Sequence, residues 1–259
     1  MELSMKNKRI LVTAGAAGIG RSFVDTFAKA GARLHVCDID QQALDALRKA
    51  EPSITTTLCD VSNLEQVDRL FENVKKELGG LDVLMNNAGI TGPTFTKVEE
   101  IRPEDWERTM AVNINGQFFC ARRAVPMLKA AGGGSIINMS SSAGRLGYPL
   151  RTPYAASKWA VVGFTQSLAM ELGPDNIRVN CLQPGFVDGP RSRRLREAQA
   201  KALGETVEQC EARMFAKTSM RQRVSPAEIA SMALFLASDM GAHITGQSLA
   251  ICGGVETLR

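Results

Sequence analysis

The stretch "RILVTAGAAGIGRSF" (residues 9–23) joins a short apolar run to three glycines and the beginning of a helical pattern. Gly15, Gly18 and Gly20 fall where a buried strand would turn into a helix. Glycine permits a tight turn and a close approach of the backbone to a phosphate group. The helix N-terminus that follows offers unpaired N–H groups and a favourable dipole. The stretch therefore predicts a strand, turn and helix that hold a pyrophosphate, with Ile19 among the binding residues.

The alternation of short apolar runs with helical patterns continues along the chain. Several runs carry apolar residues at consecutive positions, as buried parallel strands do. "SNLE" (62–65) and "SPAE" (225–228) match capping boxes, the second with proline at the first helical position. This order predicts an α/β fold, a parallel sheet of about seven strands with helices on both faces. The expected strands are 9–13, 33–38, 54–60, 81–87, 134–140, 177–182 and 247–252.

Residues 188–224 form the one irregular region of this pattern. The segment is too long for a tight connection, so we expect one or two short helices that cover an active site as a mobile lid. No repeat or low-complexity linker divides the sequence, and α/β chains of 259 residues usually stay undivided. We therefore expect a single domain over residues 1–259.

Composition and charge argue against several classes of function. A net charge of +4 with Lys and Arg spread along the chain gives no nucleic-acid footprint. The apolar part of the N-terminus is too short to span a membrane and lacks a convincing signal-peptide cleavage pattern, which predicts a cytoplasmic location. His35 and His243 lie far apart without ligand spacing, so no metal site is expected. The cysteines are scattered, mostly in apolar runs, and predict buried thiols: 37, 59, 120, 181, 210 and 252.

Two acidic residues end neighbouring predicted strands. Asp38 lies 18 residues beyond Gly20, where a carboxylate can accept from both ribose hydroxyls and repel the extra phosphate of NADP, so it favours NAD. Its alternative role is a helix cap or a strand-end turn. Asp60 can bind the adenine amino group or cap the helix that begins near Ser62. Val61, beside Asp60, and Asn87 in "NNAG" (86–89) complete the expected cofactor-binding residues at this edge.

Taken together, the motifs resemble those of the classical short-chain dehydrogenase/reductase family over essentially the whole chain. The resemblance implies a Rossmann-type doubly wound sheet, an NAD(P)-dependent oxidoreductase acting on a CH–OH group, and a homotetramer. The motifs occur in the family's order: "TAGAAGIG" (13–20), "NNAG" (86–89), "VNINGQF" (112–118), "SIINMSSSAG" (135–144), "YAASK" (154–158), "VNCLQPGFV" (179–187) and "ITGQSLAICGG" (244–254).

The resemblance also implies a catalytic set. Tyr154 and Lys158 match the family's Tyr-x-x-x-Lys, and both also count as cofactor-binding residues. Ser141, thirteen positions before the tyrosine, matches its serine, with Ser140 and Ser142 as rivals. Asn113 matches its asparagine, whose implied role is to anchor a water that relays the proton outward.

Elementary chemistry agrees with these roles. Tyrosine has an ordinary pKa of about 10, so it is a poor base near neutrality. A lysine ammonium one helical turn away, together with an oxidised nicotinamide ring, would stabilise the phenolate and lower that pKa. The alternative is an ordinary packed amphipathic helix, which would rarely place a lysine on its inward face.

The sequence departs from the family pattern at two positions. Ala14 stands where the family usually has its first glycine, and Gly189 stands where a threonine commonly helps to hold the nicotinamide carboxamide. Backbone atoms of Val187 could still serve that contact.

The substrate is less constrained by the sequence. The lid arginines are either a solvated basic helix or an anion-binding group, and they cannot all share one helical face: Arg191, Arg193, Arg194 and Arg196. Tyr148, Leu150 and Phe186 are either an apolar pocket wall or core. We expect NAD-dependent oxidation of a secondary alcohol on a small polar substrate (a sugar, sugar acid or hydroxy acid). The alternatives are an NADPH-dependent 3-oxoacyl-thioester reductase and, from another class, a catalytically silent NAD-sensing scaffold.

Overall fold

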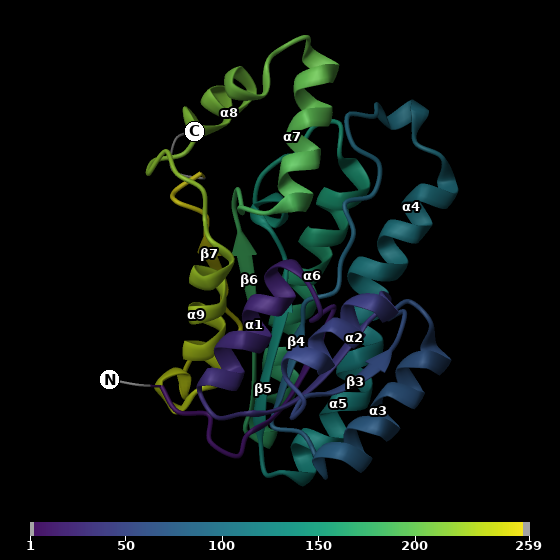
Figure 1. Cartoon of the computed structure of the whole chain (residues 1–259), viewed down its shortest axis with the longest axis vertical. Helices are drawn as coiled ribbons and strands as arrows, with labels where there is room; N and C mark the ends of the chain where they lie inside the picture. Colours follow the sequence, from purple (N-terminus) through teal and green to yellow (C-terminus); the bar gives the residue numbers. More distant parts are fainter. Residues whose placement is uncertain (1–2, 256–259) are drawn as a thin grey trace.

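Seven parallel strands form one sheet in the order β3-β2-β1-β4-β5-β6-β7 (Figure 1). The structure, a computed structural model, describes residues 3–255, apart from the side chains of Pro190 and Arg191. The predicted α/β fold with a parallel sheet of about seven strands is confirmed. Compared with the expected bounds, β3, β4, β5 and β7 are shorter and β6 is longer. The strands are β1 (Arg9–Thr13), β2 (Arg33–Asp38), β3 (Thr55–Leu58), β4 (Val83–Asn86), β5 (Gly134–Met139), β6 (Ile177–Pro184) and β7 (Ser248–Ile251).

Helices cover both faces of the sheet, because consecutive strand residues point to opposite sides. Ile10 and Val12 of β1 pack in one buried cluster with α1 (Gly18–Lys29), α2 (Gln41–Ala50) and α9 (Pro226–Ala237). Leu11 packs in the other cluster with residues of α3 (Leu64–Leu78), α5 (Gly116–Ala130) and α6 (Thr152–Leu172). Strands that are apolar at consecutive positions are therefore buried on both faces, as the sequence predicts.

The two predicted capping boxes have different outcomes. Ser225 accepts from the backbone N–H of Glu228, and the Glu228 carboxylate accepts from the backbone N–H of Ser225, so the box before α9 is confirmed. The box assigned to Ser62 is wrong. Asn63, one residue later, caps α3 by accepting from the backbone N–H of Gln66, while the Ser62 hydroxyl donates to Asp60.

The segment that follows β6 folds into two helices, α7 (Pro190–Leu203) and α8 (Val207–Phe215), as the sequence predicts. Figure 1 shows them beyond the carboxyl end of β6. An isolated bridge between Val187 and Val224 closes the base of this segment. The remaining elements are α4 (Pro103–Met110), a π-helical turn η2 (Ala111–Asn115), and 3₁₀ turns η1 (Val98–Glu100), η3 (Ser142–Gly144), η4 (Gly173–Asp175) and η5 (Asp239–Gly241).

All six cysteines are buried free thiols. Within residues 3–255, none of the helices combines the length and the apolar composition that a membrane crossing needs. The same part of the chain holds no group of three or more His, Cys, Asp or Glu side chains arranged to bind a metal ion.

Candidate active site

The carboxyl ends of β1 and β4 meet where the chain reverses its direction of travel across the sheet, which is where open α/β sheets bind their ligands. The turn after β1 is held from β4. The Asn87 side-chain amide donates to the carbonyl oxygens of Thr13 (3.0 Å) and Ala14 (2.9 Å). In return, the Thr13 hydroxyl oxygen accepts from the backbone N–H groups of Asn87 and Ala88.

The glycines of this turn have distinct steric reasons. A Cβ on Gly20 would lie 1.9 Å from the carbonyl oxygen of Ala14, so only glycine lets α1 begin this close to β1. A Cβ on Gly15 would lie 2.7 Å from the Val36 side chain. Ala14 itself has a φ of +50°, in the left-handed region that favours glycine. An alanine therefore occupies a backbone conformation that glycine adopts at lower cost.

The N-terminus of α1 fits an anionic ligand. Ala17 at its N-cap is extended, and no side chain of the described residues caps it; the first turn carries no acidic residue. The neighbouring helices differ, because α2 is capped by Asp40 and α3 by Asn63. Gly18 has a φ of +57°, and a Cβ there would meet no atom of the described structure within 4 Å. An exposed helix dipole with free N–H groups beside a glycine is suited to a pyrophosphate.

Asp38 stands at the carboxyl end of β2, where the sequence analysis placed it. One carboxylate oxygen accepts from the backbone N–H of Ala16 (3.1 Å), and the other accepts from those of Ile39 and Asp40. The strand-end role is therefore present, while the helix-cap role belongs to Asp40. The side chain is half-buried, so the carboxylate borders the cofactor edge while it braces the glycine turn.

Asp60 is also engaged by the protein. Its carboxylate accepts from the backbone N–H and the hydroxyl of Ser62 and pairs with Arg108 at 2.9 Å. Burial acts to raise the pKa of this carboxyl, but the bonds from Ser62 and Arg108 outweigh it and the pKa lies below its ordinary value. Asp60 therefore does not cap α3, which Asn63 does. Val61 is buried, and a Cβ on Gly116 would press against its side chain.

Tyr154 and Lys158 lie one turn apart on α6. The Lys158 ammonium is buried, donates to the carbonyl oxygen of Met139 at 2.8 Å, and lies 5.7 Å from the centre of the Tyr154 ring. Lysine is rarely this buried without a specific reason. Lys158 therefore faces the end of β5 rather than solvent, while Tyr154 is half-buried.

The serine run after β5 divides by burial. The Ser140 hydroxyl donates to the carbonyl oxygen of Lys158, and the side chains of Ser140 and Ser142 are both buried. Ser141 is half-buried, and its hydroxyl oxygen accepts from the backbone N–H of Ala143 at 3.2 Å. Its own proton is free of that bond, which favours Ser141 over its two rivals as the serine that can reach a ligand.

Asn113 lies in η2, where the helix locally widens to a π-turn, a feature frequent at functional sites. Its side chain is fully buried, accepts from the backbone N–H of Ile90 (2.7 Å), and donates to Ile90 O and the Ser157 hydroxyl. Ser157 in turn donates to the carbonyl oxygen of Tyr154. A Cβ on Gly89 would lie 3.2 Å from Asn113 Oδ1 and 3.3 Å from Lys158 Nζ. Asn113, Lys158 and Tyr154 are therefore neighbours.

Val187 follows β6, and its half-buried side chain packs against the core near α9. Gly189 has a φ of +144°, a backbone that glycine adopts readily and threonine does not. A threonine at position 189 would therefore be strained in this backbone.

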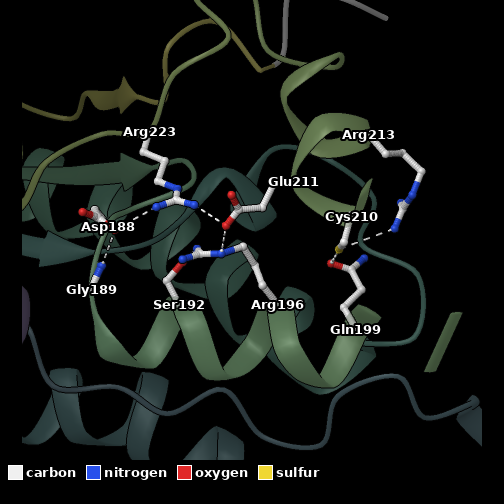
Figure 2. A network of polar contacts seen from close by, with 9 residues as sticks. All are labelled: Asp188, Gly189, Ser192, Arg196, Gln199, Cys210, Glu211, Arg213 and Arg223. Carbon is white, nitrogen blue, oxygen red and sulfur yellow. Dashed lines mark hydrogen bonds and ion pairs between the residues drawn. The ribbon is translucent and has the colours of Figure 1, made fainter. Parts of the chain in front are cut away.

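The lid arginines do not act as one group. Arg196 is buried and pairs with Glu211 at 2.5 Å; Glu211 also pairs with Arg223, which reaches Asp188 at 3.2 Å (Figure 2). Two guanidinium groups thus meet two carboxylates. Arg193 and Arg194 are exposed, and the side chain of Arg191 lies outside the described residues. The inward arginine is balanced by protein charges.

Tyr148, Leu150 and Phe186 are not core residues. Leu150 is 42% exposed, and Tyr148 and Phe186 are half-buried. Sequence reasoning missed Arg151, whose guanidinium carbon lies 4.4 Å from the centre of the Tyr154 ring. The available signal was its position, three residues before Tyr154 in "YPLRTPY".

Comparisons with known proteins agree with this arrangement. A family model described as Enoyl-(Acyl carrier protein) reductase matches residues 14–256. The chain is 35% identical over 257 residues to the 3-oxoacyl-[acyl-carrier-protein] reductase FabG of Thermotoga maritima, covering 98% of this chain and 99% of that protein. It is 35% identical over 263 residues to the 3alpha-hydroxysteroid dehydrogenase of Mediterraneibacter gnavus, covering 99% and 100%. The crystal structure of NAD+-bound xylitol dehydrogenase matches with a TM-score of 0.90 at 30% identity, covering 96% and 99%.

Proposed function

The chain belongs to the classical short-chain dehydrogenase/reductase family, and within that family we propose that it oxidises a secondary alcohol on a small polar substrate with NAD. The coarser activity, NAD(P)-dependent oxidoreduction at a CH–OH group, comes with the family. The observation that carries the proposal is that Tyr154, Lys158 and Asn113 are neighbours. Ser141 follows Ser140, whose hydroxyl donates to the carbonyl oxygen of Lys158.

In the proposed mechanism, Tyr154 is the base. Its phenolate takes the proton from the substrate hydroxyl, while Ser141 donates a hydrogen bond to the same oxygen and holds it in line. Lys158 stabilises the phenolate and binds the nicotinamide ribose. Asn113 anchors a water that passes the proton outward. When bound, NAD supplies the hydride acceptor. General acid–base help of this kind contributes typically about 10²–10⁴-fold in rate.

The residues proposed to hold NAD lie along the carboxyl edge of the sheet. Gly15, Gly18, Ile19 and Gly20 would hold the pyrophosphate at the N-terminus of α1. The preference for NAD over NADP is assigned to Asp38, since a carboxylate beside the adenosine ribose repels a second phosphate. Contacts to the adenine are assigned to Asp60 and Val61. Those near the nicotinamide end are assigned to Asn87, Tyr154, Lys158 and Val187.

The proposal extends to the shape of the working enzyme. We assign residues 188–224 as a substrate lid on a single domain. We also expect a homotetramer, since the family resemblance places α5 and α6 at subunit contacts. Phe118 on α5 and Trp159 and Met170 on α6 are 45%, 50% and 84% exposed, which suits burial by another copy. The cytoplasmic location expected from the sequence stays a prediction.

A second candidate is reduction of a 3-oxoacyl thioester with NADPH. It is favoured by the 35% identity to the Thermotoga maritima reductase and by the description of the matching family model. Asp38 argues against it, because its carboxylate disfavours the extra phosphate of NADPH. The third candidate, a silent NAD-sensing scaffold, would be favoured by a broken Ser-Tyr-Lys set, and in this chain Ser141, Tyr154 and Lys158 are all present.

A substrate screen that follows the absorbance of the reduced nicotinamide tests the proposal. Purified protein is offered sugars, sugar acids, polyols, hydroxy acids and secondary alcohols with NAD and with NADP. Tyr154→Phe serves as the inactive control. We expect turnover with NAD on one of these polar alcohols. Turnover only of an acetoacetyl thioester with NADPH would refute the proposal in favour of the second candidate. No turnover with any of these pairs, despite NAD binding, would favour the third.

A further inference from the structure

Arg151 lies against the face of the tyrosine that the proposed mechanism uses. Its guanidinium carbon is 4.4 Å from the centre of the Tyr154 ring and 5.6 Å from that of Tyr148. A cation within about 6 Å of an aromatic centre is attracted to the ring face. The Lys158 ammonium lies 5.7 Å from the same Tyr154 ring. Tyr154 therefore has two cations near it, and Arg151 lies outside the motifs quoted in the sequence analysis.

The backbone holds Arg151 in this place. Arg151 stands at the N-cap of α6, and its carbonyl oxygen accepts from the backbone N–H of Ala155 at 3.0 Å. The preceding residue, Leu150, has a φ of +62°, and its carbonyl oxygen accepts from the backbone N–H of Thr96 at 3.2 Å. A left-handed leucine is an uncommon conformation that the surrounding structure must enforce. The turn before α6 thus directs the arginine onto Tyr154.

The charge of Arg151 differs from that of the lid arginines. Arg196 and Arg223 pair with carboxylates, as Figure 2 shows. Among the described residues no ion pair with a carboxylate is recorded for Arg151, and its buried Nε has no hydrogen-bond partner there. Within residues 3–255, no paired anion therefore offsets the field of this guanidinium at Tyr154.

We propose that Arg151 is a positioning residue that holds the Tyr154 ring and stabilises its phenolate form. The proposal rests on the proposed role of Tyr154 as the base. Arginine keeps its charge at any working pH, so its field favours loss of the tyrosine proton whether or not NAD is bound. An opposite charge within about 4–6 Å shifts a pKa by roughly 1–3 units, and the half-exposed position of Arg151 puts its effect near the lower limit.

Other charged groups near α6 are few. On α6 itself Lys158 faces the ring. From β6 the buried Cys181 thiol lies near Lys158 and near Arg145, an exposed arginine that directly follows η3. Within the described residues, β5, η2 and η3 carry no ionisable side chain. Among the charged residues of α4, Asp105 pairs with Arg102 and Arg108 pairs with Asp60. The other two acids of α4, Glu104 and Glu107, are exposed.

The protein contains only two tyrosines, Tyr148 and Tyr154, so the ionisation of Tyr154 can be measured without a substrate. In a Tyr148→Phe background, Tyr154 is the sole source of tyrosinate absorbance. We compare the pH midpoint of that absorbance in this background with the midpoints after adding Arg151→Met, Arg151→Gln or Arg151→Lys. Arg48→Met is the matched control, because Arg48 is an exposed arginine on α2, across the sheet from α6. Far-ultraviolet circular dichroism at each pH checks that the protein is folded.

Arg151→Met and Arg151→Gln are expected to raise the midpoint by roughly one pH unit. Arg151→Lys keeps the positive charge, so its midpoint is expected to lie closer to that of the Tyr148→Phe protein. Arg48→Met should leave the midpoint within about 0.2 pH unit of that of the Tyr148→Phe protein. The proposal is wrong if the folded Arg151→Met and Arg151→Gln variants both have the same midpoint as the Tyr148→Phe protein. It is also wrong if Arg151→Lys raises the midpoint as much as Arg151→Met does, or if Arg48→Met raises it as much. The titration needs no turnover. A protein inactive on every alcohol would therefore refute the proposed function alone, and an active enzyme with no midpoint shift would refute the role of Arg151 alone.

Discussion

Acid should destabilise this protein through His35, which is buried in β2 against the edge strand β3. Its two ring nitrogens lie 2.7 Å from the Thr55 hydroxyl and 2.9 Å from the Thr57 hydroxyl. Thr55 donates to the carbonyl oxygen of Leu34, so it can only accept from the histidine. Thr57 accepts from Asn73 and can donate its proton to the other ring nitrogen. This pattern fits a neutral imidazole, and burial lowers the pKa of His35 from 6.5 to about 4.

The sign and the size of the effect follow from proton linkage. In the unfolded chain the pKa of His35 returns to 6.5, so between 6.5 and about 4 the unfolded state binds a proton that the folded state does not. The contribution of neutral His35 to the free energy of unfolding is fully present above the unfolded-state pKa and is lost as the pH falls below it. From this difference in pKa, the free energy of unfolding should fall by about 3 kcal/mol in the limit of low pH, of which about 2 kcal/mol is lost between pH 7 and pH 5.

Urea unfolding at pH 7 and pH 5 measures this loss. His35→Gln removes the titrating group. Between pH 7 and pH 5, its free energy of unfolding should therefore fall by about 2 kcal/mol less than that of the parent protein. His243→Gln changes the only other histidine, which is exposed, and should keep the pH dependence of the parent protein. Equal losses in the parent and His35→Gln would refute the assignment. Because β2 carries Asp38 and β3 leads to Asp60, we expect the proposed adenosine end of the cofactor site to loosen first in acid.

Three further predictions concern the site. Tyr154→Phe should lower kcat by at least about 10²-fold and leave the Kd for NAD nearly unchanged, as measured by cofactor titration; full activity would exclude Tyr154 as the base. Asp38→Ala should erode the ratio of kcat/KM with NAD to that with NADP, whereas Asp25→Ala, an exposed acid on α1, should not; an unchanged ratio would remove Asp38 from that role. Ala14→Gly should raise the free energy of unfolding by up to about 1 kcal/mol, since it relieves a left-handed alanine. A loss of stability in urea would show that the turn is not strained at this position.

The strands and most of the site positions could be predicted because their signals are local. Runs such as "RILVT" are apolar at consecutive positions, and a strand buried on both faces requires that pattern. Tyr154 and Lys158 are separated by four residues, and one helical turn brings them together in any α-helix. The carboxyl ends of parallel strands share one edge, so Asp38 and the glycine turn had to be neighbours once the strands were assigned.

The errors arose where neighbouring residues compete for the same bond. Ser62 and Asn63 are both good N-cap residues, and the sequence alone does not decide between them. In the structure Asn63 is the cap, since its side chain accepts from the backbone N–H of Gln66. The Asp60 carboxylate accepts from the backbone N–H of Ser62, and the backbone N–H of Asp60 donates to the Gln66 side chain. The turn that Asp60 closes is a tertiary feature, since Arg108 reaches it from α4. A local pattern therefore found the start of the helix but missed its cap by one residue.

In residues 188–224, the proposed lid, the number of arginines overstates the positive charge available to bind an anionic substrate. The run "RSRRLR" (191–196) is strongly basic in sequence, yet its one described inward arginine, Arg196, meets Glu211 from α8. Glu211 also pairs with Arg223, and Arg223 pairs with Asp188 near the beginning of the 188–224 segment. Two positive and two negative charges are therefore joined by consecutive ion pairs. Such a network holds α7, α8 and the strand end together while its net charge is zero. Arg151, by contrast, is a single arginine in the turn before α6, and its guanidinium lies closer than the Lys158 ammonium to the ring centre of the proposed base. Position relative to Tyr154, rather than the density of arginines, is therefore what gives a positive charge its influence on the reaction.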